Sequence, residues 1–181
     1  GSNETGTVQE SNITLNGSTN TQNQDNSLET IITPSSRAIA DWEKTNYGTN
    51  FNQVVTVNVE IKNNSDKTIK SWEGTINIPK SKLYNNYSSD TEVIDNNGKY
   101  TFTSAGRWNT QSNHELAPGS SYTFNFTILQ ENTYFTSEYK ITGKNETEEN
   151  LTSTNTGFKI YGGNNKGGLT NNANVNIKNG Y

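Results

Sequence analysis

Apolar and polar residues alternate along the middle of the chain. Three segments show this period-two pattern, at residues 53–62, 68–79 and 122–128. An extended chain with such a pattern places its apolar side chains on one face, as a half-buried antiparallel strand requires. Tyr100 and Phe102 mark a shorter strand. The predicted inward-facing residues are Val55, Val57, Val59, Ile61, Trp72, Gly74, Ile76, Ile78, Tyr122, Phe124, Phe126 and Ile128.

The segments between these strands carry turn residues. Residues 63–67 predict a hairpin loop that joins the first two strands, residues 95–98 supply Asn and Gly, which tolerate positive φ, and residues 117–119 form an Ala-Pro-Gly turn. Nowhere does a helical repeat extend over three turns. The pattern therefore predicts an all-β protein, an antiparallel β-sandwich of the immunoglobulin-like or jelly-roll-like kind.

The apolar density is uneven, and this predicts the domain organisation. Residues 1–33 form a polar linker with too few apolar side chains to order it. Residues 34–130 form the sandwich. Residues 131–181 are a C-terminal extension whose brief alternations, the last at 174–178, fit either extra strands or the start of another module.

Composition narrows the function. The absence of cysteine excludes disulfides and thiolate zinc sites. With a net charge of -4 and 14 basic residues spread along the chain, there is no basic stripe, so we expect no nucleic-acid partner. No run approaches the roughly 20 apolar residues of a membrane span. The Asn/Thr/Ser-rich stretches are typical of a secreted or cell-surface protein with several modules.

The titratable residues do not form a recognisable catalytic set. His114 is the only histidine, and we expect it on a surface loop. The acidic run at residues 146–149 is interpreted as a solvated turn, because a glycosidase needs two carboxylates held across a cleft. Residues 95–98 lack the ligand spacing of a calcium loop. We therefore expect no enzyme activity, no metal and no cofactor.

Three stretches carry a resemblance to a known family. They are residues 46–57, residues 69–76, and residues 106–126, in which Trp108-Asn109 is followed by a Leu-Ala-Pro-Gly turn into an aromatic strand. Over residues 37–129, about half of the chain, the sequence resembles the family 2 carbohydrate-binding modules, best known as bacterial cellulose-binding domains.

The resemblance implies a binding face. In that family, three exposed aromatic side chains lie nearly coplanar on one face of a β-sandwich and stack on sugar rings. The matching positions here are Tyr47, then Tyr87 with Tyr84 as the alternative, and Trp108. The family often has Trp at the first two positions, so Tyr there offers less ring area.

The resemblance also implies two packed tryptophans. Trp72 matches the buried core Trp of the family, and Trp42 falls where the first strand carries a packed aromatic. The family's disulfide between its chain ends is missing, so the ends of this domain must be held in another way.

A flat aromatic ring covers the apolar C–H face of a sugar and leaves its hydroxyls in water. The resemblance thus implies a non-catalytic module of a larger protein that binds polysaccharide, cellulose first and xylan second. Starch, which coils and prefers a curved aromatic pair, is an alternative within this class, and a structural or adhesive sandwich without a sugar ligand is another. Polar neighbours expected to bond sugar hydroxyls are Asn46, Asn50, Arg107, Asn109 and Gln111.

Overall fold

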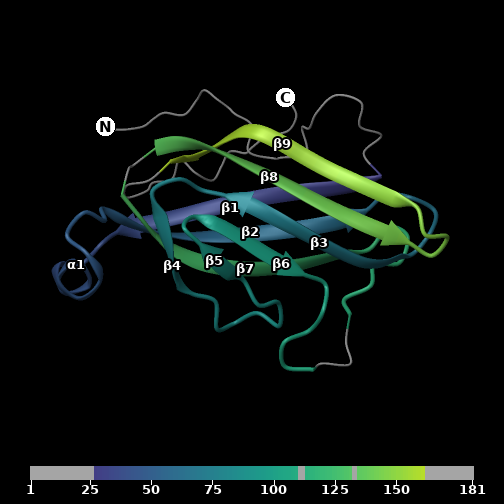
Figure 1. Cartoon of the computed structure of the whole chain (residues 1–181), viewed down its shortest axis with the longest axis horizontal. Helices are drawn as coiled ribbons and strands as arrows, with labels where there is room; N and C mark the ends of the chain where they lie inside the picture. The colour runs from purple at the N-terminus through teal and green to yellow at the C-terminus, as the bar shows by residue number, and fades with distance from the viewer. Residues whose placement is uncertain (1–26, 110–112, 132–133, 162–181) are drawn as a thin grey trace.

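Two antiparallel sheets pack face to face, one of four strands in the order β1-β2-β7-β4 and one of five in the order β5-β6-β3-β8-β9 (Figure 1). The computed structural model describes residues 27–109, 113–131 and 134–161. The described residues include one helix, α1. The predicted all-β antiparallel sandwich is confirmed.

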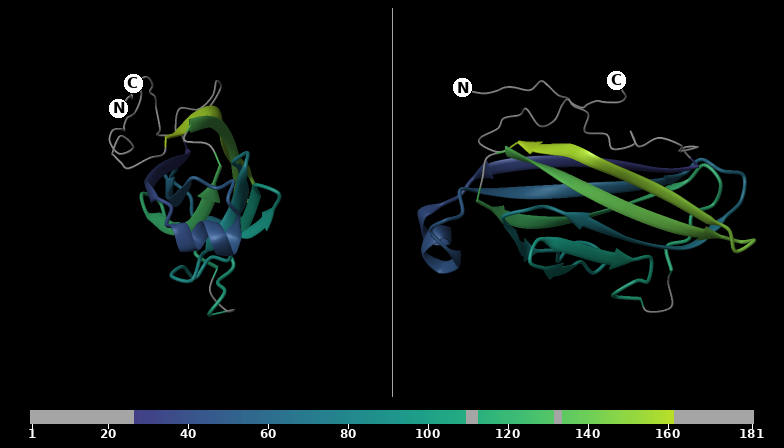
Figure 2. Two further views of the ribbon diagram at one scale, coloured as in Figure 1. Left: turned by 90° about the vertical axis from the view of Figure 1, so that its left-hand side faces the viewer. Right: turned by 45° about the horizontal axis from the view of Figure 1, so that its top comes forward.

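The four-stranded sheet is built of β1 (Leu28–Ala38), β2 (Gln53–Asn63), β7 (Ser121–Gln130) and β4 (Ser81–Asn85). The five-stranded sheet is built of β5 (Ile94–Asn96), β6 (Lys99–Thr103), β3 (Ile69–Asn77), β8 (Tyr134–Asn145) and β9 (Asn150–Tyr161). Seen from the end of the long axis, the two sheets form two layers (Figure 2).

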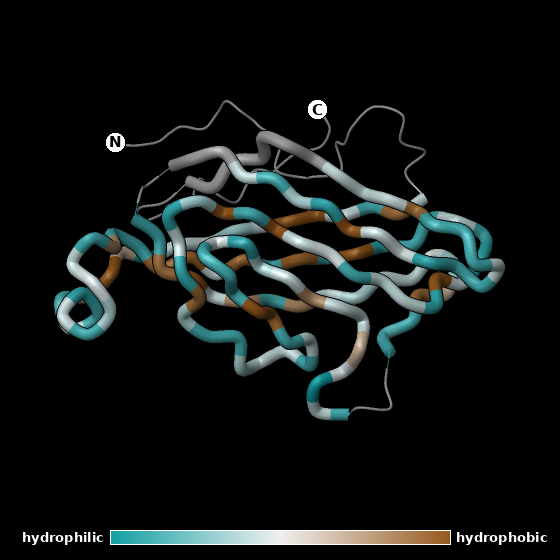
Figure 3. Tube along the Cα trace, in the orientation of Figure 1, coloured by the Kyte–Doolittle hydropathy of each residue, from teal (hydrophilic) through white to brown (hydrophobic). Residues whose placement is uncertain are grey.

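The core lies between the sheets, and the alternation of the sequence predicts most of it. The four predicted residues of β2 are completely buried, as are Ile76 of β3 and Ile78, which directly follows that strand. Trp72 is buried too, and its ring stacks on Phe124 with centroids 6.1 Å apart. Figure 3 shows the apolar positions recurring along these strands. The inward-facing pattern is confirmed, with Tyr122 and Gly74 only partly buried.

The predicted hairpin at residues 63–67 is wrong. It leads from β2 into β3, and these strands belong to different sheets. A hairpin would put both apolar faces on one side of a single sheet, whereas crossing to the other layer lets β2 and β3 face each other over the core. Asn63 holds the crossing, since its amide donates to the carbonyl oxygens of Lys67 and Leu116, both at 2.8 Å.

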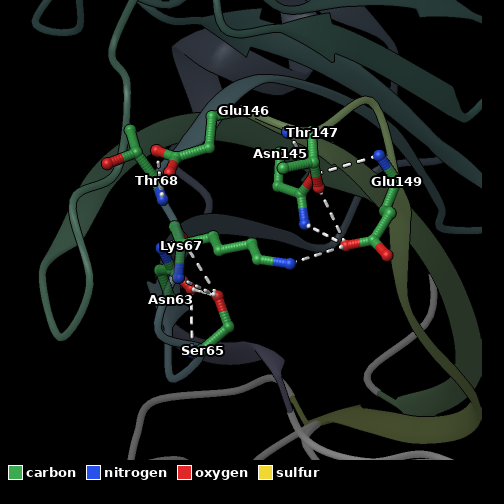
Figure 4. A network of polar contacts seen from close by, with 8 residues as sticks. All are labelled: Asn63, Ser65, Lys67, Thr68, Asn145, Glu146, Thr147 and Glu149. Atoms are coloured by element: carbon green, nitrogen blue, oxygen red, sulfur yellow. Dashed lines mark hydrogen bonds and ion pairs between the residues drawn. The ribbon is translucent and has the colours of Figure 1, made fainter.

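The β8–β9 turn lies beside this crossing at one end of the sandwich (Figure 4). Lys67 Nζ lies 3.4 Å from Glu149 Oε1, and the backbone N–H of Thr68 donates to Glu146 Oε1 over 3.2 Å. Asn145 accepts from the backbone N–H groups of Thr147 and Glu149. The acidic run is therefore an exposed turn, as predicted.

The sandwich begins earlier than the expected linker boundary at residue 34. Residues 28–33 form the first half of β1, which pairs with β2 from Leu28 opposite Asn63 onward. Leu28 and Ile32 are buried, so a few well-spaced apolar side chains order a segment that is polar on average. The rest of the expected linker, residues 1–26, lies outside the described residues.

Residues 134–161 are strands of the same sandwich, which answers the alternative left open for the C-terminal extension. β8 pairs with β3 and β9 pairs with β8. The Thr30 hydroxyl donates to Ser153 Oγ at 2.9 Å, so the first strand of the domain contacts the last without a disulfide. Residues 162–181, including the alternation at 174–178, lie outside the described residues.

The segment before β2 covers the outer face of the four-stranded sheet at one end. Phe51, Val54 and Leu129 form a second buried cluster there, against which Ile39 and Tyr84 pack. The alternation places Val54 on the solvent side, yet it is buried because α1 (Asp41–Tyr47) and its flanks fold back over it.

Candidate functional site

Large apolar side chains are exposed at few places on the described surface. Tyr87 is 79% exposed, Trp108 62% and Tyr47 39%, as the resemblance implies for sugar-stacking residues. Trp42 is also exposed, at 58%. Single exposed apolar residues are ordinary, whereas contiguous exposed apolar surface marks interaction sites.

Tyr87 stands on a loop that is fastened on both sides. Asn86, which precedes it, is buried, donates to Thr91 O at 2.9 Å and accepts from the backbone N–H of Val93 at 3.1 Å. Ser89, which follows it, is also buried, and its hydroxyl accepts from the Asn125 N–H of β7 at 2.9 Å. The exposed ring therefore projects from a loop with little freedom to move.

Asp90 joins this loop to the loop of Trp108. Its Oδ1 accepts from the Trp108 backbone N–H at 2.6 Å, and its own carbonyl oxygen accepts from the Arg107 N–H at 2.6 Å. Its Oδ2 lies 2.8 Å from His114 Nε2. One carboxylate thus fixes the backbone that carries the Trp108 ring.

Arg107 joins the same loops from the other side. Its guanidinium donates to the carbonyl oxygens of Asn86 and Ser89, the second at 2.8 Å, and lies 5.6 Å from the Trp108 ring centroid. Its Nε is buried and has no hydrogen-bond partner among the residues that the structure describes. Arg107 was predicted to bond sugar hydroxyls, but its guanidinium holds the protein's own loops. We call residues 86–93 and 104–109 together the aromatic loops.

His114 anchors the aromatic loops to the core. It lies on a loop as predicted, but its side chain is only 20% exposed and its ring stacks on Tyr122 with centroids 4.1 Å apart. Its carbonyl oxygen accepts from the indole N–H of the buried Trp72 at 2.9 Å. The predicted loop position is confirmed, but the ring is half-buried and not on the open surface, because it stacks on Tyr122 and pairs with Asp90.

Tyr47 belongs to a different group of rings. Its centroid lies 6.5 Å from that of Trp42 and 5.2 Å from that of Tyr84, with the ring planes inclined at 62° and 66°. Trp42 does not pack in the first strand as the resemblance implies. It lies on α1, because the chain forms a helix there instead of continuing β1, and the helix turns Trp42 to solvent.

A buried carboxylate fastens α1. Glu43 is 1% exposed and accepts from both terminal nitrogens of Arg37, at 2.9 and 2.7 Å, and from the backbone N–H of Ala40 at 2.9 Å. The Tyr84 hydroxyl donates to it at 2.6 Å. The Arg37 hydrogen bonds outweigh burial and lower the pKa of Glu43 to about 2, while the bond to Glu43 raises the pKa of Tyr84 to about 12. Gly48, with φ of 142°, ends the helix.

Tyr84, the alternative second position, is half-buried, and its hydroxyl is engaged by Glu43. Among the polar neighbours, Asn46, Asn50 and Asn109 are exposed, and Asn50 donates to Glu131 Oε2 at 2.9 Å. Gln111 lies outside the described residues.

The predicted aromatic residues thus fall into two places. Tyr87 and Trp108 are brought together on hydrogen-bonded loops, which project from one long side of the sandwich in Figures 1 and 2. Tyr47 and Trp42 lie on α1, at one end of the long axis. The single coplanar strip of Tyr47, Tyr87 and Trp108 stays a prediction.

Asp90, Asn86 and Ser89 were not predicted from the sequence. Each stands in a polar stretch that is indistinguishable by composition from any surface loop, and several of their partners, Asn125 and Arg107 among them, are remote in the chain. Only the flanking of Tyr87 by small polar residues hinted at a constrained turn.

Within the described residues, no group of three His, Cys, Asp or Glu side chains could hold a metal ion. That part of the chain also has no helix of the length and hydrophobicity needed to cross a membrane.

Known proteins are only distantly similar. No protein-family model matches the chain, and no curated protein sequence matches it. Solved structures with a similar backbone include the full-length major pilin SpaD from Corynebacterium diphtheriae, at 11% identity over 74% of this chain and 35% of that chain, with a TM-score of 0.48. The match thus spans about a third of the pilin.

Two smaller proteins are also similar. The chitin-binding domain of Chi18aC from Streptomyces coelicolor matches at 21% identity over 55% of this chain and 80% of that chain, with a TM-score of 0.33. An uncharacterized Nocardia farcinica protein with an immunoglobulin-like fold matches at 12% identity over 55% and 72%, with a TM-score of 0.35. At TM-scores below 0.5, none of these likenesses carries a functional argument.

Proposed function

We propose that this protein is a non-catalytic carbohydrate-binding module that holds polysaccharide on Tyr87 and Trp108 of the aromatic loops. The polymer proposed first is cellulose and the second is xylan. The module would then keep an attached enzyme or cell surface close to its substrate, as part of a larger secreted or cell-surface protein.

The observation that carries this proposal is that the loops bearing the exposed rings of Tyr87 and Trp108 are fixed to each other by hydrogen bonds. Asp90 and Arg107 together make five hydrogen bonds or close polar contacts that tie the loop of Tyr87 to the loop of Trp108 and to His114. Buried polar groups are costly unless they are paired, so such a network serves to fix the loops in one conformation. The rings at its surface contribute little to the core.

Rigid rings suit sugar binding. Each ring that stacks on a sugar contributes on the order of 1 kcal/mol beyond the area it buries. Loops that are already ordered lose little conformational entropy when ligand binds, so two such contacts add up. Asn109, exposed beside Trp108, is a candidate to bond sugar hydroxyls.

The test is co-sedimentation of the purified protein with insoluble cellulose, xylan, starch and chitin. We expect cellulose or xylan to deplete the wild-type protein from solution, and Trp108→Ala and Tyr87→Ala each to weaken binding about fivefold to tenfold. Their unfolding free energy should stay within about 0.5 kcal/mol of wild type, as for other exposed positions.

Ile94→Ala is the matched control, because Ile94 is exposed at 58% on β5 and its loss removes apolar surface without removing a ring. It should bind like wild type. Failure to bind both cellulose and xylan would overturn the proposal, and failure to bind any of the four polymers would favour the other class of function, a structural or adhesive sandwich.

A further inference from the structure

The exposed ring of Trp42 does not hold the fold together. Its helix is held by Glu43 and by the cluster of Phe51, Val54 and Leu129 beneath, whereas the Trp42 ring lies 58% open to solvent. An indole left exposed on a firmly attached helix, next to a second exposed ring, is a surface of the kind that binds ligand. Tyr47 is that second ring.

The geometry of the pair differs from a flat platform. The planes of Trp42 and Tyr47 are inclined at 62° with centroids 6.5 Å apart. Two consecutive sugars can stack on both rings only if their own faces turn by a similar angle. In a flat, extended β-glucan ribbon the faces of successive sugars stay nearly parallel, so such a ribbon meets at most one of these rings.

The surroundings favour a neutral, hydroxyl-rich ligand. Asp41, Thr45 and Asn46 are exposed on the same short helix, and together they offer both donors and acceptors to hydroxyl groups. The residues around the pair include Lys44 as well as Asp41, so no single sign of charge dominates. A coiled glucan matches both the inclined rings and this mixed polar rim.

We propose that Trp42 and Tyr47 form a second sugar-binding site that takes a coiled, α-linked glucan chain, separate from the aromatic loops. This second site rests on the proposed function, since both sites bind sugar by stacking it on aromatic rings. The two sites differ in the polysaccharide they bind, because the inclination of the Trp42 and Tyr47 rings selects a curved glucan chain.

The test is calorimetric titration of the whole protein with a soluble α-1,4-glucan oligosaccharide and, separately, with a β-1,4-glucan oligosaccharide. We expect the α-glucan to bind, Trp42→Ala to weaken that binding about tenfold, and Trp108→Ala to leave it unchanged. Trp42→Phe should keep most of the affinity and Trp42→Leu should not, since leucine retains apolar area but lacks a ring face.

Three results would overturn the second site: no binding of the α-glucan, equal loss in Trp42→Ala and Trp108→Ala, or full affinity in Trp42→Leu. These are distinct from failure of the proposed function, which would appear as wild-type protein that binds neither insoluble cellulose nor insoluble xylan. Thermal unfolding of each Trp42 variant should match wild type, so that lost affinity reports the ring and not the fold.

Discussion

Among single residues, Asp90 connects the two aromatic loops most directly. Its side chain accepts from the Trp108 N–H and pairs with His114, and its carbonyl oxygen accepts from Arg107. The side chain is only 18% exposed, and we expect it to position Trp108 without touching ligand. Its importance is visible only when residues remote in the sequence are seen side by side.

Asp90→Ala should therefore weaken polysaccharide binding although the Trp108 ring is still present. Loss of the acceptor for the exposed Trp108 N–H and of the partner for the part-buried His114 ring should lower the unfolding free energy by about 1–3 kcal/mol. Denaturant unfolding and co-sedimentation measure the two effects. Glu92→Ala, which removes an exposed carboxylate from the same loop, is the control and should change neither. Unchanged binding by Asp90→Ala would show that Trp108 needs no such support.

The residue scale also shows where pattern reasoning succeeds. Alternation predicts that Val57 and Trp72 are buried, because the period of a strand fixes which face each residue takes. It fails at Val54, which lies on the outward face but is covered by α1, and no local pattern reveals that cover. The resemblance implies exposure for Tyr47, Tyr87 and Trp108, and all three rings are exposed.

At the scale of elements, α1 is the clearest departure from expectation. Seven residues give too short a helical repeat to be distinguished from a loop, so Trp42 was expected in a strand. The helix is held in place by Glu43, whose partners Arg37 and Tyr84 come from the end of β1 and from β4. The pairing of Glu43 with Tyr84, 41 residues away, cannot be read from the local sequence.

The pH dependence of stability should report this anchor. In the folded protein the pKa of Glu43 is lowered from 4.5 to about 2, mainly by the Arg37 hydrogen bonds. A lowered folded pKa means that the carboxylate's contribution is fully present above pH 4.5 and is lost as the pH falls toward about 2. Denaturant unfolding between those values measures the loss.

Glu43→Gln should remove that contribution. Near neutral pH we expect its unfolding free energy to lie about 1–3 kcal/mol below wild type, and the gap to shrink as the pH falls below 4.5. Glu73→Gln, at an exposed position of β3, should show no such gap. A Glu43→Gln gap of constant size across this range would contradict the assigned role of the charged carboxylate.

At the scale of the whole molecule, the first and last residues of the sandwich are set by strand pairing more than by the average hydrophobicity of the chain. The expected domain of residues 34–130 omits half of β1 and all of β8 and β9, which are polar on average. β8 pairs along one edge of β3, so its loss would expose that edge of the β3 backbone and remove Tyr139 and Ile141 from the core. A strand's average polarity is a poor guide when only alternate residues are buried.

Truncation tests this directly. A protein of residues 27–161 should show cooperative thermal unfolding by circular dichroism, whereas residues 34–130 should show no cooperative transition, because an edge of the core is left unpaired. A cooperative transition in the shorter chain would show that β8 and β9 are accessory to the fold.

The central claim is that sugar binds to the rings of the aromatic loops. The most direct test follows the three tryptophan indole N–H signals in a nitrogen-15 NMR titration. The ligand is an oligosaccharide of the polymer that binds. We predict that the Trp108 signal shifts and saturates with ligand, while that of Trp72, whose N–H is bonded to His114 inside the protein, stays in place. Saturable binding with an unmoved Trp108 signal would contradict the account.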